Sequence, residues 1–292
     1  MSFLGVLSAL VSAISWAAVT IIYCHLLKKI SSLNLNLYRS ILACIYFLIP
    51  IIAIGWTATN LKDTTLLLLS GILGIAIADT FYFLALRHLG PRLTTISISF
   101  VPVATALTSF IFLNERIHPA ACIGIIFTSI GIGWVLWERN SNLLPIAINK
   151  FAGLQYAILS IIAMTAAILL AKLGVSSTPA IQGAFLRTVG AVSALLVYNL
   201  SRKRNFLIFW RELTNPELFK ALCIMALITT FGGFYLSLYA IKHLPASIAS
   251  TLNSTTPLFV LPFTIWFFKE RISRRAVFGA LITVIGIALI LC

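Results

Sequence analysis

The sequence predicts an all-α membrane protein with ten membrane-spanning helices, and three observations support this fold class. First, 60% of the 292 residues are hydrophobic, 10% are charged and the mean hydropathy is +1.05, which a water-facing surface could not accommodate. Second, apolar runs of roughly 20 residues, long enough to cross a bilayer core of about 30 Å, follow one another with short interruptions. Third, the runs are continuously apolar rather than alternating, which favours helices over a β-barrel.

The ten runs leave little chain outside them. No basic residue precedes the first run and no small-residue cleavage site follows it, so we interpret it as a retained helix rather than a secretory signal. The five cysteines show no metal-ligand spacing, and we expect neither a metal nor a cofactor. The expected helices span residues 3–27, 34–56, 64–86, 92–113, 119–137, 151–172, 180–200, 217–241, 246–268 and 274–292.

The chain contains an internal repeat. The stretch FLNERI at 112–117 returns as FFKERI at 267–272, 155 positions later, and each ends an apolar run. Arg39 and Arg187 match at a shorter offset of 148, so the second half carries seven extra residues between these regions. The repeat predicts two five-helix halves, 1–146 and 147–292. Further matches at 155 are His88-Leu89 with His243-Leu244, Ser99 with Ser254, Pro102 with Pro257, Gly124 with Gly279, and Gly131 with Gly286.

An odd number of helices in each half has a geometric consequence. The second half must begin on the opposite side of the membrane from the first, so the two repeats are expected to be inverted. Inverted repeats recur in secondary transporters, where the two halves enclose a site near the membrane midplane.

Two five-helix halves, each with Glu-Arg after its fourth helix and G-x6-G in its last helix, resemble the EamA-type transporters of the drug/metabolite transporter superfamily. The resemblance covers the whole chain. It implies a ten-helix basket with a central cavity lined by the first four helices of each half, and with the fifth and tenth helices as scaffold. It also implies transport of small metabolites, often amino-acid export, and in relatives transport of nucleotide sugars, phosphorylated sugars or cationic drugs.

We therefore expect a secondary active transporter, not an enzyme, that moves an amino acid or a similar amphipathic solute by alternating access. No nucleotide-binding loop is present, so an ion gradient, for example of protons, or the solute's own gradient would supply the energy. Nucleotide-type metabolites or drugs are the alternative solutes. A lipid-modifying enzyme or a flippase is the alternative of another class. The expected location is a bacterial inner membrane.

Asp79 is the acid that lies well inside an apolar run. A carboxylate there costs roughly 2.5–3.5 kcal/mol on insertion scales, so it should face a cavity or a partner. Helical spacing places Tyr82 and Phe83 on its side. Asp79 is a candidate ligand for a substrate amine or a candidate proton-coupling group; a structural ion pair is the alternative.

Arg39 and Arg187 lie near the starts of the second and seventh helices. Each guanidinium could bind an anionic group or reach the headgroups, and their duplication favours a structural role shared by the halves. Gln182 and Trp16 are further candidates for the same space, although a lone aromatic in a membrane helix is more often packing.

Hydroxyl residues crowd the first halves of the fourth and ninth helices, and each cluster ends at a proline. Pro102 should free the carbonyl of Ile98, and Pro257 that of Asn253. Freed carbonyls are tolerated in lipid only where they face protein or water; close helix packing by Ser and Thr is the alternative reading. The candidate cavity residues from this pattern are Ser99, Asn253, Thr256, Tyr235 and Tyr239.

Four glycines and two ion pairs are assigned to structure. The glycines lie two turns apart on one face of the fifth and tenth helices, where small residues let backbones approach; they are Gly124, Gly131, Gly279 and Gly286. Glu115-Arg116 and Glu270-Arg271 follow helix ends, where a solvated pair or a fixed loop is expected.

The net charge of +14 is scattered over short loops, which argues against nucleic-acid binding. Sixteen of the 21 Lys and Arg residues fall on the side of the odd-numbered loops, counting Arg39 with the first loop. The positive-inside rule then places both termini outside the cytoplasm, whereas the resemblance implies cytoplasmic termini. The four histidines form no zinc-helix motif, which disfavours the enzyme alternative.

Overall fold

A computed structural model describes residues 2–27, 29–115, 118–138, 149–201, 214–256, 258–259 and 274–291. All regular structure in these ranges is helical, as predicted. The helices are α1 (Phe3–Leu26), α2 (Ser32–Ile54), α3 (Leu61–Gly71), the π-helix η1 (Ile72–Ala78), α4 (Asp79–Ile98), α5 (Val101–Leu113), α6 (Pro119–Glu138), α7 (Lys150–Gly174), α8 (Ala180–Ser201), α10 (Pro216–Ile228), the π-helix η2 (Thr229–Tyr235), α11 (Leu236–His243), α12 (Ala246–Asn253) and α14 (Arg274–Leu291).

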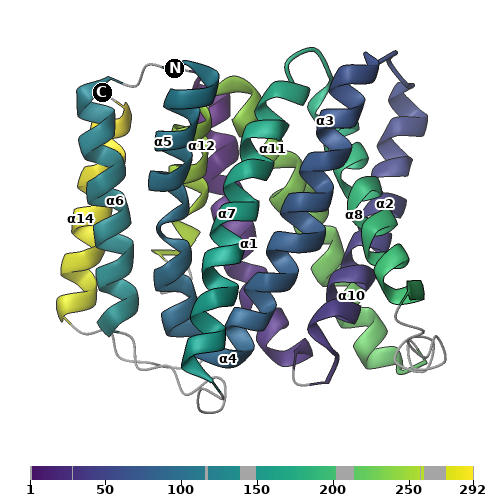
Figure 1. Ribbon diagram of the computed structural model, residues 1–292, viewed down its shortest axis with the longest axis horizontal. Coiled ribbons are helices and arrows are strands. Elements are labelled where there is room, and N and C mark those ends of the chain that lie inside the picture. Colours follow the sequence, from purple (N-terminus) through teal and green to yellow (C-terminus); the bar gives the residue numbers. More distant parts are fainter. Residues whose placement is uncertain are drawn as a thin grey trace.

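The helices stand side by side in one bundle. Both ends of the chain lie at the same end of the bundle, the top in Figure 1. In the described residues, six helices are long and apolar enough to cross a membrane, and three shorter apolar helices accompany them. Large hydrophobic side chains cover the outside of the bundle; Ile52, for example, is 79% exposed. Such a surface fits lipid and not water, so the protein is a multi-pass membrane protein. Its ten-span arrangement stays a prediction.

The boundary between the third and fourth predicted helices is wrong. A loop was expected between 86 and 92, but helical structure continues from Leu61 to Ile98 and breaks at Ser99 and Phe100. Pro102 was expected inside a helix; it lies instead in the first turn of α5. Proline has no N–H to bond the carbonyl four residues earlier, and the first turn of a helix requires none. The chain therefore starts a new helix at this proline.

The ninth predicted helix breaks at the matching place. Helix α12 ends at Asn253, and Ser254 and Thr255 form a turn, 155 residues after Ser99 and Phe100. The carbonyl of Asn253 accepts a hydrogen bond from the hydroxyl of Thr256 at 2.9 Å. Pro257 itself lies outside the described residues, as do Glu270 and Arg271.

Each half of the chain contributes a helix to the other half. Helix α1 packs on η2, α11 and α12, and α7 packs on α3, η1, α4 and α5. The contacts correspond in detail: Gly5 lies against His243 and Leu244, and Gly153 lies against His88 and Leu89. In both cases the absence of a side chain lets the helix approach its neighbour closely.

Helices α6 and α14 form a pair at one edge of the bundle (Figure 1). A Cβ atom added to Gly124 would lie 2.6 Å from the carbonyl oxygen of Gly286, and one added to Gly131 would lie 2.7 Å from that of Gly279. The two backbones therefore touch along the face that carries all four glycines.

Candidate functional site

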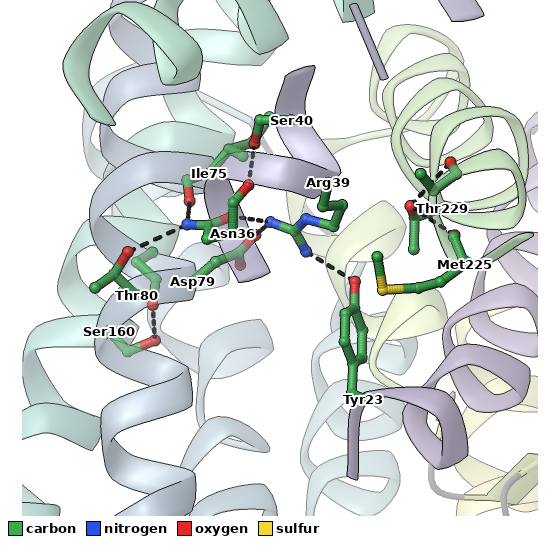
Figure 2. A network of polar contacts seen from close by, with 12 residues as sticks. Tyr23, Asn36, Arg39, Ser40, Ile75, Asp79, Thr80, Ser160, Met225 and Thr229 are labelled. Atoms are coloured by element: carbon green, nitrogen blue, oxygen red, sulfur yellow. Dashed lines mark hydrogen bonds and ion pairs between the residues drawn. The ribbon is translucent and has the colours of Figure 1, made fainter. Parts of the chain in front are cut away.

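Arg39, on α2, lies inside the bundle in a network of polar contacts (Figure 2). Its side chain is 1% exposed and forms an ion pair of 2.5 Å with Asp79. Its terminal nitrogens also donate hydrogen bonds to Oδ1 of Asn36 at 2.6 Å and to the hydroxyl of Tyr23 at 2.9 Å. A guanidinium buried in a low-dielectric interior needs such partners, and three helical segments supply them.

The π-helix η1 supplies a backbone carbonyl that accepts a hydrogen bond in this network. The backbone N–H of Asp79 bonds to the carbonyl of Gly74, five residues earlier, and not to that of Ile75, its partner in an α-helix. The carbonyl of Ile75 accepts a hydrogen bond from Nδ2 of Asn36 at 2.7 Å. The wide turn therefore offers a backbone acceptor that anchors Asn36, and Asn36 in turn orients Arg39.

Aromatic rings enclose the Arg39 guanidinium. Its central carbon lies 5.0 Å from the ring centroid of Phe234, 5.7 Å from that of Phe83 and 5.9 Å from that of Tyr23. Trp16 meets Phe234 edge to face, with 5.7 Å between ring centroids. The cation is thus held by hydrogen bonds at its terminal nitrogens and by rings around it.

Arg187, on α8, lies where this helix crosses α3 and η1. A Cβ atom added to Gly71 would lie 1.8 Å from the carbonyl oxygen of Arg187, and one added to Gly74 would lie 3.4 Å from its terminal nitrogen. The guanidinium is near enough to interact electrostatically with Asp79. The backbone contact at Gly71 therefore brings a second arginine to the wide turn of η1.

The two arginines differ in their partners. The Nε atoms of both are buried without a hydrogen-bond partner. The terminal nitrogens of Arg39 have three partners, whereas within the described part of the chain no hydrogen bond reaches the guanidinium of Arg187. Arg187 is also partly exposed while Arg39 is buried. One arginine is fixed in place, and the other is open to a further contact.

The internal repeat explains this difference. Each residue that bonds to Arg39, and Thr80, which bonds to Asn36, has a counterpart in the second half at an offset of 148 or 155, and these counterparts are apolar or aromatic. Alanines occupy the positions that match Tyr23 and Asn36, and a phenylalanine occupies the position that matches Asp79. The counterparts are Ala171 for Tyr23, Ala184 for Asn36, Phe234 for Asp79 and Tyr235 for Thr80.

The model of the EamA-like transporter family matches this chain twice, over residues 3–137 and 151–292. The chain belongs to the EamA-like transporter family. The match confirms the resemblance drawn from the duplicated Glu-Arg and glycine motifs. It points to a transporter rather than an enzyme, and to a membrane setting for the Arg39 network.

Two known proteins are similar to this chain over nearly its whole length. This EamA-like chain is 26% identical to a protein of Archaeoglobus fulgidus described as an uncharacterized transporter, over 99% of this chain and 98% of that protein. It also resembles a solved structure, described only as the crystal structure of a protein, with a TM-score of 0.74, 15% identity, and coverage of 98% of this chain and 95% of that one. The second likeness concerns the fold alone.

Three further candidates of the EamA-like chain lie at different distances from the Arg39 network. Trp16 packs on Phe234 and so belongs to the wall around Arg39. Tyr82 packs beside Phe83, with 5.7 Å between ring centroids. Gln182 lies near the end of α2: its Oε1 accepts from Thr57 at 3.0 Å and its Nε2 donates to the carbonyl of Gly55 at 3.3 Å. Both polar atoms of Gln182 are engaged in joining α8 to the residues after α2.

A second polar group joins α11 to α12. Asn253 donates a hydrogen bond to Ser237 at 3.0 Å, and its Oδ1 is buried with no partner in the described residues. Tyr235 and Tyr239 lie on the same helical segment as Ser237, with 6.2 Å between their ring centroids. Thr256 bonds to the carbonyl of Asn253, as described above, and Ser99 is buried. The hydrogen bonds of Asn253 and Thr256 therefore link the end of α12 to α11 and to its own last turn, not to Arg39 or Asp79.

Glu115, in the first copy of the Glu-Arg motif, fixes the junction before α12. Both oxygens of its carboxylate accept from the backbone N–H of Ala246, at 3.1 and 3.0 Å. A carboxylate at the start of a helix satisfies a free N–H and complements the helix dipole. Nearby, Nζ of Lys172 donates to the carbonyls of Ile241 and Leu244, at 2.9 and 2.6 Å, at the end of α11.

Sequence reasoning missed two residues of the network, Asn36 and Ser160, and the residue Ser12 that matches Ser160 in the repeat. Asn36 precedes Arg39 by one helical turn, so the spacing could have shown it. Ser160 donates to the carbonyl of Ala78 at 2.9 Å, and Ser12 donates to that of Gly233 at 3.3 Å. The serines are 148 residues apart and the carbonyls 155 apart, so the repeat could have indicated this matched pair.

Proposed function

We propose that this EamA-like protein is a secondary active transporter that moves a small metabolite by alternating access, with a central site between its two halves. The buried cluster of Arg39, Asp79 and Arg187 carries the proposal. Ionisable groups inside a membrane are expensive and mark solute or ion pathways. This cluster draws on both halves of the chain, because α2, η1 and α4 belong to the first and α8 to the second.

The proposed halves are inverted five-helix repeats, residues 1–146 and 147–292. The exchanged contacts support this arrangement: Ser12 bonds to η2 as Ser160 bonds to η1, and Gly5 and Gly153 pack against matching His-Leu pairs. An approximate two-fold relation would produce such pairs. Rocking of one half against the other would then change which side of the membrane reaches the central cluster.

We assign Asp79 the coupling role in this mechanism. Its carboxylate is 14% exposed and interacts with both arginines. Protonation of Asp79 would weaken its hold on Arg39 and change the balance between the halves. An amino acid or a similar amphipathic solute fits the aromatic walls formed by Trp16, Phe83 and Phe234.

Purified protein in liposomes tests this function. A thermal-shift screen against metabolites would identify stabilising solutes, and uptake of a radiolabelled hit would then be measured with and without a pH gradient. Asp79→Asn should abolish the effect of the pH gradient while leaving solute exchange measurable. Glu217→Gln, on the exposed start of α10, is the matched control and should behave as wild type.

Unchanged pH dependence in Asp79→Asn would remove the coupling role from this residue. If no stabilising solute crosses the membrane under any gradient, the transporter assignment itself fails.

A further inference from the structure

We infer that Arg187 binds an anionic group of the transported solute, a carboxylate or a phosphate, and that the preferred solute is therefore an amphipathic organic anion. This inference rests on the proposed transport function and narrows its substrate class. It starts from the charges that the structure places around η1.

The charges of the central cluster do not cancel. Arg39 and Arg187 carry two positive charges, and Asp79 carries one negative charge. The negative charge of Asp79 already neutralises Arg39 in their ion pair of 2.5 Å. The remaining charge lies within helices that are long and apolar enough to span the membrane, where an uncompensated cation is costly.

Among the described residues, Arg187 has no hydrogen-bonded acid of its own, and its electrostatic interaction with Asp79 is shared with Arg39. At the repeat positions that supply the partners of Arg39, the second half has Ala171, Ala184 and Phe234. None of these three side chains carries a negative charge or a hydrogen-bonding group. A bound anion would supply the negative charge that the described residues of this cluster lack.

Arg187 is not fully enclosed by the described residues. The side chain is partly exposed, unlike that of Arg39. Its terminal nitrogen lies close to Gly74, where the absence of a side chain leaves the wide turn open to the guanidinium. A guanidinium presents paired donors that match a carboxylate or a phosphate in two parallel hydrogen bonds.

Charge also distinguishes between classes of solute. A monoanion cancels the excess charge of the cluster when it binds. A zwitterion, such as an amino acid, adds no net charge, and its ammonium group would need an acceptor in competition with Arg39. A cationic solute would increase the excess positive charge of the cluster. The expected order of affinity is anion, then zwitterion, then cation.

Four probes with the same aromatic ring test this order: 3-phenylpropionate, phenyl phosphate, phenylalanine and phenethylamine. Thermal unfolding of the purified full chain would be measured with each at equal ionic strength. We expect a rise in Tm of roughly 5 °C at saturating concentration of a bound anion, a smaller rise with phenylalanine, and none with phenethylamine. A response to 3-phenylpropionate alone would indicate a carboxylate site, and a response to phenyl phosphate alone a phosphate site.

Arg187→Gln should abolish the anion response, while its own Tm without ligand stays equal to or above that of wild type, because an uncompensated charge is removed. A purely structural arginine would instead lower the Tm when replaced. Arg187→Lys keeps the charge and should retain part of the response, and Arg87→Gln, at an exposed position of α4, should retain all of it. The inference is overturned if neither anion raises the Tm, or if the rise persists in Arg187→Gln.

Liposome uptake separates this inference from the proposed function. Uptake of labelled phenylalanine without any anion response would overturn the anion site and leave the transporter. Binding of 3-phenylpropionate that depends on Arg187, without uptake of any probe, would support the anion site and overturn transport.

Discussion

Arg39 and Arg187 occupy the same place in the two halves of this EamA-like protein, yet their surroundings differ. Arg39 is buried among Asp79, Asn36 and Tyr23, which all bond to it. Arg187 lies against the backbone of Gly71 and Gly74 and, among the described residues, has no hydrogen-bond partner at its guanidinium. The same residue type is therefore a fixed structural cation in one half and an open cation in the other.

The contacts that hold the halves together differ much less. Gly5 and Gly153 pack on matching residues, and Ser12 and Ser160 bond to matching carbonyls. The two π-helices also fall at nearly the same place in each half, Ile72–Ala78 and Thr229–Tyr235. The duplicated chain thus keeps these packing contacts and varies the polar residues around the two arginines.

Breaking the Arg39–Asp79 pair should give the largest effect. Asp79→Leu leaves two uncompensated cations and should destabilise the protein by about 3–5 kcal/mol. Arg39→Met leaves Asp79 with the charge of Arg187 nearby and should cost less. The double variant removes both charges and should recover most of this loss. Unfolding in detergent would measure all three, and additive losses in the double variant would show that the two residues do not act as a pair.

The crossing of α3 and α8 should respond next. Gly71→Ala forces a methyl group against the carbonyl of Arg187, and overpacking of this kind costs about 1–3 kcal/mol. The matching residue in the second half is already an alanine, Ala226, which is buried. Ala226→Gly is the control and should cost about 1 kcal/mol. Equal tolerance of both substitutions in a thermal unfolding assay would contradict the close approach that brings Arg187 to η1.

Adding an acid to the second half should remove the difference between the arginines. Phe234→Asp places a carboxylate at the position that matches Asp79, beside Arg39. Asp79 would then be available to Arg187, and the cluster would carry two charges of each sign. We expect at least a tenfold loss of affinity for 3-phenylpropionate, equivalent to about 1.4 kcal/mol. Phe234→Leu, which adds no charge, is the control, and an equal loss in that variant would assign the effect to packing.

The sequence alone predicted the helices well where they are long and uninterrupted, as in α1, α7 and α8. It failed between 86 and 100, because apolar periodicity does not show whether a helix continues through Gly90-Pro91 or ends there. It identified Asp79 and both arginines, since charge in an apolar run is costly. It could not show that Asp79 pairs with Arg39. That pairing depends on the wide turn of η1, and no local residue pattern predicts a π-helix.

Removing the hydroxyl groups of Ser12 and Ser160 should give the smallest effect. These variants test the contacts that correspond in the two halves. Ser160→Ala removes a buried hydrogen bond of 2.9 Å to η1, and Ser12→Ala removes one of 3.3 Å to η2. A buried hydrogen bond contributes about 1 kcal/mol, so both variants should unfold at slightly lower temperature, with Ser12→Ala nearer to wild type because its bond is longer. Ser193→Ala, whose hydroxyl bonds to the carbonyl of Val189 within α8 at an exposed position, is the control. Because each serine joins its own helix to the π-helix of the other half, both losses should also be accompanied by altered uptake rates. A stability change without any change in uptake would limit these bonds to holding the halves together and exclude a part in their relative motion.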